Sequence, residues 1–189
     1  MKRWNKKVKE IILKSRKLST NLLSSKITAL PYSLRPELFI SSSATGFYGD
    51  CGHDCLDEMS CSGDLFISDV CQKWEDCASC VADSGIRTVY ARMGVVLTPS
   101  GGALETLLPL FMMGMGTTIG SGRQYMSWID MDDLIYSIYH IIAEKSIEGA
   151  VNLVSPYPVT YHDFTKTVAK VLNRPAPFKI PDSLIRLLW

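Results

Sequence analysis

The sequence predicts an α/β fold in which a parallel sheet carries helices on both faces. Short, uninterrupted apolar runs are typical of strands buried on both sides, and here they alternate with longer segments whose apolar residues recur at helical spacing. Alternation of this kind indicates an α/β sheet. The 189 residues are 47% hydrophobic and 21% charged, which is the usual balance for one packed globular domain.

The first predicted element is an amphipathic helix over residues 5–24. Its polar face is rich in lysine and arginine, and we interpret that face as solvated because no aromatic residues accompany the charges. Contact with nucleic acid or anionic lipid, or a role as a mitochondrial presequence, are the alternatives for these residues. The apolar residues of the face predicted to pack inward are Val8, Ile11, Ile12, Leu18, Leu22 and Leu23.

Two buried strands and one helix are predicted next. The apolar run 38–40 ends in three serines, 41–43, and leads into a glycine-containing loop. A helix over 68–83 follows, and Gly85 is placed to end it in the left-handed conformation. The second buried strand is 86–92. Because ligands of open α/β sheets bind at the carboxyl ends of the strands, the polar residues at these two strand ends are candidate site residues.

The rest of the chain alternates in the same way. Helices are predicted over 102–113 and 132–144, and a strand over 150–154. Thr160 and Asp163 then form a capping pattern for a last helix. The residues expected to face inward from the last two helices are Leu134, Ile135, Ile138, Ile141, Ile142, Phe164, Val168, Val171 and Leu172.

Net charge and hydropathy exclude several classes of protein. The formal net charge is +1, so a general polyanion binder is not expected, although the first 17 residues are basic. No apolar stretch is long enough to span a bilayer, and the charged start is not followed by the apolar core of a signal peptide. We therefore expect a cytoplasmic protein with no nucleic-acid partner and no membrane partner.

The cysteines are predicted to be free thiols that bind no metal. Cys77 and Cys80 form a Cys-x-x-Cys pair, but Cys77 continues the apolar spacing of the helix over 68–83, where a thiol packs as a small hydrophobic group. Zinc knuckles usually present such pairs on turns, and disulfides are rare in a reducing cytoplasm. The six cysteines are Cys51, Cys55, Cys61, Cys71, Cys77 and Cys80.

Four blocks of sequence carry a family resemblance. The first, residues 41–49, reads Ser-Ser-Ser-Ala-Thr-Gly-Phe-Tyr-Gly and is similar to the serine-bearing strand end of extended short-chain dehydrogenases, Ser-Ser-x-x-x-Tyr-Gly. With the extra Gly46 it resembles one atypical branch, the "epimerase family" of bacteria and organelles. The other blocks are 92–104, 120–133 and 152–159, which resemble that family in order and spacing.

This resemblance implies a Rossmann-like, doubly wound parallel sheet that binds NAD or NADP and acts on a nucleotide-sugar or a similar polyol. Ser43 matches the family's catalytic serine, whose hydroxyl hydrogen-bonds the substrate oxygen that changes between alcohol and carbonyl. A serine that only caps the strand end is the alternative. Tyr48 is a candidate catalytic proton donor, with a packed loop aromatic as the alternative.

The resemblance also implies ligand contacts. Ser41, Ser42 and Arg92 are the implied cofactor-binding residues. Arg123 and Gln124 lie in a loop that in extended relatives closes over the substrate, where an arginine suits a diphosphate or a carboxylate.

One departure from the superfamily pattern concerns its acid/base pair. The general acid/base tyrosine stands four residues before a lysine that holds the cofactor ribose. Aligning Glu75 with the glutamate that commonly follows this lysine puts Ile67 at the tyrosine position and Cys71 at the lysine position. Neither side chain supplies the proton or the fixed positive charge. The epimerase family shares this substitution.

A second departure is the glycine-rich turn that binds the pyrophosphate of a dinucleotide. No glycine precedes Gly46, so this turn is absent from the sequence. We therefore expect residues 1–172 to be the carboxyl-terminal portion of a Rossmann domain that lacks the amino-terminal glycine-rich βαβ unit. Residues 173–189 are expected to open a small carboxyl-terminal domain of unknown function.

Such a fragment is expected to be inactive alone, to bind no NAD(P) by itself, and to depend on the missing amino-terminal segment or another chain. The alternative is a non-catalytic nucleotide- or sugar-binding protein of the same fold.

Overall fold

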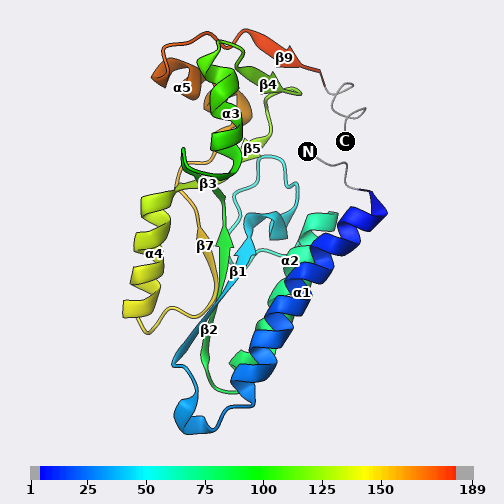
Figure 1. Cartoon of the computed structure of the whole chain (residues 1–189), viewed down its shortest axis with the longest axis vertical. Coiled ribbons are helices and arrows are strands. Elements are labelled where there is room, and N and C mark those ends of the chain that lie inside the picture. The colour runs from blue at the N-terminus through cyan, green and yellow to red at the C-terminus, as the bar shows by residue number, and fades with distance from the viewer. Residues whose placement is uncertain (1–4, 182–189) are drawn as a thin grey trace. The chain divides into compact units, whose positions relative to one another are not determined.

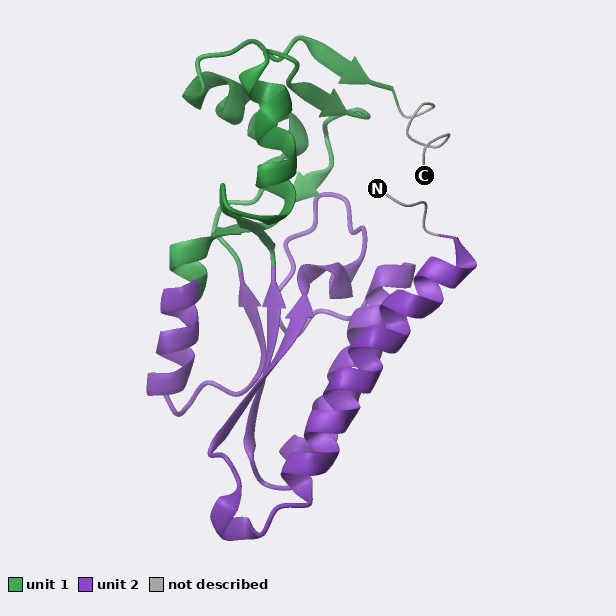
Figure 2. Ribbon diagram, in the orientation of Figure 1, with its two compact units in different colours: residues 1–3, 94–134, 154–189 green, residues 4–93, 135–153 purple. Residues whose placement is uncertain are grey.

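The computed structural model of the chain describes residues 5–181. Figure 1 shows its helices and strands, and Figure 2 shows that they form two compact units. Unit 1 comprises the described residues 94–134 and 154–181, and unit 2 comprises residues 5–93 and 135–153.

This division does not test the domain boundary predicted at residue 172. Most of the predicted second domain, residues 182–189, lies outside the described residues.

Unit 2 is built on a three-stranded parallel sheet. Its strands are β1 (Leu38–Ala44), β2 (Arg87–Met93) and β7 (Gly149–Leu153), in the order β1-β2-β7. The three strands predicted from apolar runs are confirmed. The serines lie inside β1 and not beyond it, because the hydrogen-bonded ladder with β2 continues as far as Ala44 and Met93.

Helices lie on both faces of this sheet, as predicted. α1 (Lys6–Thr28) packs along α2 (Phe66–Asp83), and α2 contacts both β1 and β2. The unit 2 part of α4 (Met131–Ala143) lies on the opposite side of the sheet (Figure 2). Its end is tied to the sheet by Arg87, which donates from Nη1 to the main-chain oxygen of Ile141 at 3.0 Å.

The prediction of α1 is right in its existence and mostly wrong in its buried face, since only Val8 and Ile12 of the predicted inward residues are half-buried. Ile11, Leu18 and Leu22 are 57%, 58% and 61% exposed among the described residues. The helix instead buries Thr20 and Ser24. Small side chains allow α2 to approach closely, and the indole nitrogen of Trp74 donates to Thr20 Oγ1 at 2.8 Å. The hydrogen bond between Trp74 and Thr20 therefore lies in the interface of α1 and α2. The apolar periodicity had predicted that a different face of α1 forms this interface.

α2 follows its prediction closely. Gly85 takes the positive φ of 82° expected of a residue that ends a helix. Cys77 is buried among apolar residues of the helix, as predicted for a small hydrophobic thiol.

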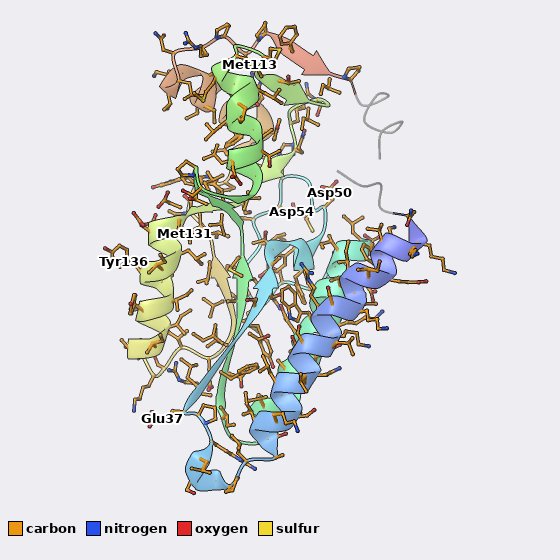
Figure 3. The ribbon with its side chains drawn as sticks, viewed as in Figure 1. Glu37, Asp50, Asp54, Met113, Met131 and Tyr136 are labelled. Carbon is orange, nitrogen blue, oxygen red and sulfur yellow. The ribbon has the colours of Figure 1, made fainter. Side chains whose placement is uncertain are left out.

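The inward residues predicted for α4 are correct only in part. Leu134 and Ile141, seven residues apart, are buried, whereas Ile135 and Ile142 are exposed. One position along a helix rotates a side chain by about 100°, so a short helix can bury one stripe and leave the next in solvent. Tyr136 also points away from the sheet (Figure 3).

Unit 1 consists of short strand pairs and two helices. β3 (Val95–Leu97) pairs with β6 (Trp128–Asp130), and β4 (Thr117–Ile119) pairs with β9 (Phe178–Ile180), both in parallel. β5 (Tyr125–Met126) pairs with β8 (Val159–Thr160) in antiparallel fashion. These strands were not predicted, because two or three residues carry no readable periodicity.

The helices of unit 1 are α3 (Gly102–Met112) and α5 (Tyr161–Val171). The predicted cap of α5 is confirmed, since Thr160 Oγ1 accepts a hydrogen bond from the Asp163 main-chain nitrogen at 3.1 Å. Phe164 is buried as predicted, but Val171 is exposed, because it stands in the last turn of the helix.

Within residues 5–181, no helix has the length and apolar character needed to cross a membrane. All six cysteines are free thiols, and no group of three or more histidine, cysteine or acidic residues in this range is arranged to hold a metal ion.

Candidate functional site

A row of three polar side chains crosses the sheet of unit 2 near the carboxyl ends of its strands. In the register of the sheet, Ser43 of β1 stands beside Arg92 of β2, and Arg92 stands beside Asn152 of β7. Register partners on adjacent strands lie about 4.8 Å apart with their side chains on the same face. The sheet therefore brings together residues that are far apart in the sequence.

Glu75, from α2, joins the first two members of this row. Ser43 Oγ donates to Glu75 Oε1 at 2.6 Å. Arg92 binds the same carboxylate in bidentate fashion, from Nε to Oε1 at 2.9 Å and from Nη2 to Oε2 at 2.9 Å. The ion pair is largely buried, with 6% of the arginine side chain and 12% of the glutamate side chain exposed. Bidentate pairs of this kind fix geometry as well as charge.

Tyr48 joins this network on the other side of the Arg92 guanidinium. It belongs to the short 3-10 helix η2 (Thr45–Tyr48) that follows β1. Arg92 Nη1 donates to the Tyr48 hydroxyl at 3.0 Å, and that hydroxyl donates to Asn152 Oδ1 at 2.7 Å. The guanidinium carbon also lies 3.5 Å from the ring centroid of Phe47, which is a cation–π arrangement.

Burial and pairing set the protonation of these groups. Burial disfavours the charged guanidinium, but hydrogen bonds with Glu75 and Tyr48 outweigh it, so the pKa of Arg92 is raised. Burial likewise raises the pKa of the Cys71 thiol, one helical turn before Glu75. Cys71 is therefore a neutral thiol, while the cation in this network is Arg92.

A loop segment crosses the carboxyl ends of the strands, and we call residues 50–62 the strap. Figure 3 labels Asp50 and Asp54 on it. Its base is closed by Gly63, whose main-chain nitrogen donates to the oxygen of Phe47 at 2.9 Å. Glu58 anchors the strap to β7, because its Oε1 accepts a hydrogen bond from the Asn152 main-chain nitrogen at 2.8 Å.

Three of the predicted site residues meet in this network, namely Ser43, Tyr48 and Arg92. They are 2%, 4% and 5% exposed, respectively. Ser41 is buried on the same strand, and Ser42, which alternates to the other face of β1, is exposed. Their roles in catalysis and cofactor binding stay predictions.

Arg123 and Gln124 belong to unit 1, between β4 and β5. Both are exposed, and the side chain of Gln124 donates from Nε2 to the main-chain oxygen of Ile119 at 2.9 Å. Their role as substrate contacts also stays a prediction.

Glu75, Asn152 and Glu58 were missed as site residues. The sequence held a signal for the first two, because buried polar groups need hydrogen-bond partners. Asn152 is itself a polar residue inside a buried strand. Arg92 is another, and it needs an acidic partner such as Glu75. Glu75 was used only as an alignment anchor. Glu58 lies in an irregular loop without a pattern that could have marked it.

The chemistry of the network follows from its donors and acceptors. The proton of Ser43 is committed to Glu75 and that of Tyr48 to Asn152, so in this arrangement both hydroxyls offer only lone pairs to a further group. Arg92 supplies a permanent positive charge beside them. This arrangement fits residues that hold strand ends and orient a polar ligand better than it fits free proton donors.

Comparison with known proteins gives relatives along nearly the whole chain. The epimerase family protein Mb2239 of Mycobacterium bovis is 37% identical over 185 residues, which is 98% of this chain and 60% of the relative. The chain thus spans about three fifths of the length of the curated relatives it matches. No family model matches the chain.

Solved structures agree in fold. The human epimerase family protein SDR39U1, crystallised with NADPH, superimposes with a TM-score of 0.92 at 33% identity, over 100% of this chain and 63% of that chain. A nucleoside-diphosphate sugar epimerase from Corynebacterium glutamicum gives a TM-score of 0.79 at 36% identity, over 99% of this chain and 41% of that chain. The chain therefore has homologues named epimerase family proteins and a Rossmann-like α/β fold.

Proposed function

We propose that the chain belongs to the epimerase family and forms the substrate-side portion of an NAD(P)-dependent, nucleotide-sugar epimerase-like or reductase-like protein. The observation that carries this proposal is the match of nearly the whole chain to proteins of that name, one of which was crystallised with NADPH. The row of Ser43, Arg92 and Asn152 supports it, because it lies at the strand ends where open α/β sheets bind ligands.

A dinucleotide does not fit the residues of this chain taken alone. The pyrophosphate of NAD(P) needs main-chain N–H groups of a glycine-rich turn at a helix start, and no glycine precedes Gly46. Among the described helices, α1 and α2 start without such a turn, and α3 starts at Gly102 after Gly101 but lacks the further glycine of the dinucleotide-binding pattern. We therefore propose that these residues alone are inactive and that a glycine-rich βαβ unit outside them, in an amino-terminal segment or in another chain, supplies the cofactor site.

The open edge of the sheet fits such a partner. Among the described strands, β1 pairs on one side only, with β2. An unpaired strand edge is a template for a further strand. A strand of that unit would continue the parallel sheet beside Ser41, Ser42 and Ser43.

Within this proposal the polar row has defined roles. Ser43 holds the reacting substrate oxygen: with its proton on Glu75 it accepts a hydrogen bond from a substrate hydroxyl, and its proton turns from Glu75 to the substrate when that oxygen is a carbonyl. Arg92, with Ser41 and Ser42, borders the cofactor, and its charge favours a nearby phosphate. Arg123 and Gln124 bind the polar part of a nucleotide-sugar substrate. A cytoplasmic location, without nucleic-acid or membrane partners, belongs to the same proposal.

A non-catalytic binding protein of the same fold is the second candidate. The observation in its favour is that the hydroxyls of Ser43 and Tyr48 donate to Glu75 and Asn152, while Ile67 and Cys71 occupy the acid/base positions. Such a protein would bind the nucleotide-sugar and NAD(P) without transferring a hydride.

Fragment complementation tests the proposal. The chain would be co-expressed with the part of human SDR39U1 that it does not match, and NADPH binding would be followed by nicotinamide fluorescence. We expect micromolar binding for the pair, and for the chain alone nothing tighter than about millimolar, an affinity of about 4 kcal/mol. Micromolar binding by the chain alone would overturn the claim that it lacks a cofactor site.

Activity then separates the two candidates. If the complemented protein oxidises NADPH with a keto-sugar nucleotide, Ser43→Ala should lower turnover by at least about tenfold, since the reacting oxygen loses its positioned partner. Tight NADPH binding without any hydride transfer would instead support the non-catalytic protein.

A further inference from the structure

A carboxylate of the protein itself occupies the carboxyl end of β7. Glu58 Oε1 accepts the main-chain N–H of Asn152 at 2.8 Å, although Glu58 is an exposed loop residue. In open α/β sheets this end of the strands is where ligands bind. The N–H of Asn152 is thus a hydrogen-bond donor suited to an anion, and an internal carboxylate occupies it.

The neighbouring guanidinium has one side without an anionic partner. Nε and Nη2 of Arg92 are held by Glu75, whereas Nη1 donates to the neutral hydroxyl of Tyr48. The other contact of Nη1 is the main-chain oxygen of Glu58 at 3.4 Å, which is longer than the usual range of about 2.7–3.2 Å. Glu58 therefore covers the side of Arg92 on which an oxyanion would be stabilised.

We propose that the strap is a lid latched by Glu58, and that its opening uncovers a binding subsite for an oxyanion, a carboxylate or a phosphate, on the Asn152 N–H and Arg92 Nη1. At the Asn152 N–H, the carboxylate of Glu58 takes the place of that ligand, and its main-chain oxygen faces Arg92 Nη1. The role of Arg92 beside a phosphate rests on the proposed function; the inference adds to it the Asn152 N–H and the Glu58 latch, which this chain holds by itself.

The construction of the strap suits a lid that moves as one piece. Asp57 braces it internally, accepting hydrogen bonds from the Met59 main-chain nitrogen at 3.1 Å and from Ser60 Oγ at 2.8 Å. Met59, beside the latch, is 90% exposed, so apolar burial does not hold the strap down there. Segments with few buried contacts open at low free-energy cost.

The strap is held tightly at its base, beside Gly63, whereas its tip is held by the hydrogen bond of Glu58. A Cβ added to Gly63 would come within 2.4 Å of the Tyr48 main-chain oxygen, so strap and η2 are in close contact at this point. Opening therefore consists of releasing Glu58 at the tip.

Hydrogen exchange of the whole 189-residue chain, read by mass spectrometry, tests the latch. Glu58→Ala should speed exchange at Asn152 and across residues 50–62 by at least about tenfold. The matched control is Asp54→Asn, an exposed acidic residue of the same strap, which should leave both rates unchanged. Equal rates in the wild type and the Glu58→Ala variant would overturn the latch.

Anions test the subsite. Sodium phosphate, sodium acetate and sodium chloride would be compared at matched ionic strength. Protection of Asn152 in Glu58→Ala by phosphate or acetate, and not by chloride, supports the subsite, and the stronger of the two identifies the ligand chemistry. Faster exchange that no anion reverses would overturn it.

Glu58→Gln keeps the test open if the alanine variant does not fold. It retains a weaker acceptor of the same size, so exchange at Asn152 should fall between those of the wild type and an open strap. An unchanged rate in this variant argues against the latch. Because no nicotinamide cofactor is used, failure here is distinguishable from failure of the proposed function.

Discussion

Glu75 accepts three hydrogen bonds, one from Ser43 and two from Arg92, and each of these residues belongs to a different strand. The carboxylate thereby joins α2 to the ends of β1 and β2. A buried ion pair contributes little net stability compared with an apolar pair, but removal of one partner leaves a buried charge uncompensated. Glu75, which the sequence comparison matched to the glutamate after the superfamily lysine, is thus also the residue that balances the charge of Arg92, the cation of this network.

Glu75→Ala should lower the free energy of unfolding by about 3–5 kcal/mol, because Arg92 would remain buried and unpaired. Urea denaturation of the variant and of Asp76→Asn measures the effect. Asp76 is the exposed neighbour on the same helix, and its change should stay within about 0.5 kcal/mol. Similar losses for both variants would show that the ion pair carries no special weight.

The six thiols should differ sharply in reactivity. Cys71 is buried and its pKa is raised by burial, so little thiolate is present at neutral pH, whereas Cys55, Cys61 and Cys80 are exposed. An aromatic disulfide reagent added to the folded chain should modify the exposed thiols first and reach Cys71 only after denaturant is added. Early modification of Cys71, located by peptide mapping, would contradict its burial.

At the scale of elements, the sequence predicted what long apolar patterns determine. β1, β2, β7 and α2 were found because their apolar runs and the glycine after α2 are local signals. The packed face of α1 was missed, because Thr20 is buried through a hydrogen bond to Trp74, 54 residues away. Ser43 and Arg92 could be predicted as strand-end residues, but their pairing with Glu75 depends on how α2 docks, which local periodicity does not contain.

The corrected orientation of α1 can be measured. Replacing Leu18 and Leu22 by glutamine should change the free energy of unfolding by no more than about 0.5 kcal/mol, as for other surface substitutions. Trp74→Phe removes the donor to Thr20 and should cost about 1–3 kcal/mol. If the leucine variants were instead the more destabilised, the face predicted from the sequence would be the packed one.

At the scale of the whole molecule, buried neutral groups that ionise at high pH act together. Burial raises the pKa values of Cys71, Cys77, Tyr90 and Tyr161. Each is held neutral in the folded state, whereas the unfolded chain loses these protons near the ordinary values of 9.0 for cysteine and 10.0 for tyrosine. The contribution of these four groups to stability is therefore complete below pH 9.0 and is lost as the pH rises above it.

Urea denaturation at a series of alkaline pH values should show a free energy of unfolding that falls steadily above pH 9.0. Cys71→Ala should make this fall shallower, because one of the linked groups is gone. Cys80→Ala, an exposed thiol on the same helix, is the control and should leave the slope unchanged. A flat profile in the wild-type chain would contradict the burial of these groups.

The discontinuity of unit 2 has a consequence for synthesis on the ribosome. Its sheet takes β1 and β2 from residues 38–93 but β7 from residues 149–153, and the chain of unit 1 begins in between. At roughly 5–20 residues per second, the nascent chain waits for seconds after β2 is made before β7 can cover the second edge. During this interval Glu75 and Tyr48 are available to Arg92, and Glu75 to Ser43, but Asn152 is not yet available to Tyr48. The Glu75–Arg92 pair can thus form early and hold β1 and β2 in register. The Tyr48–Asn152 bond, in contrast, can form only after β7 has been synthesised.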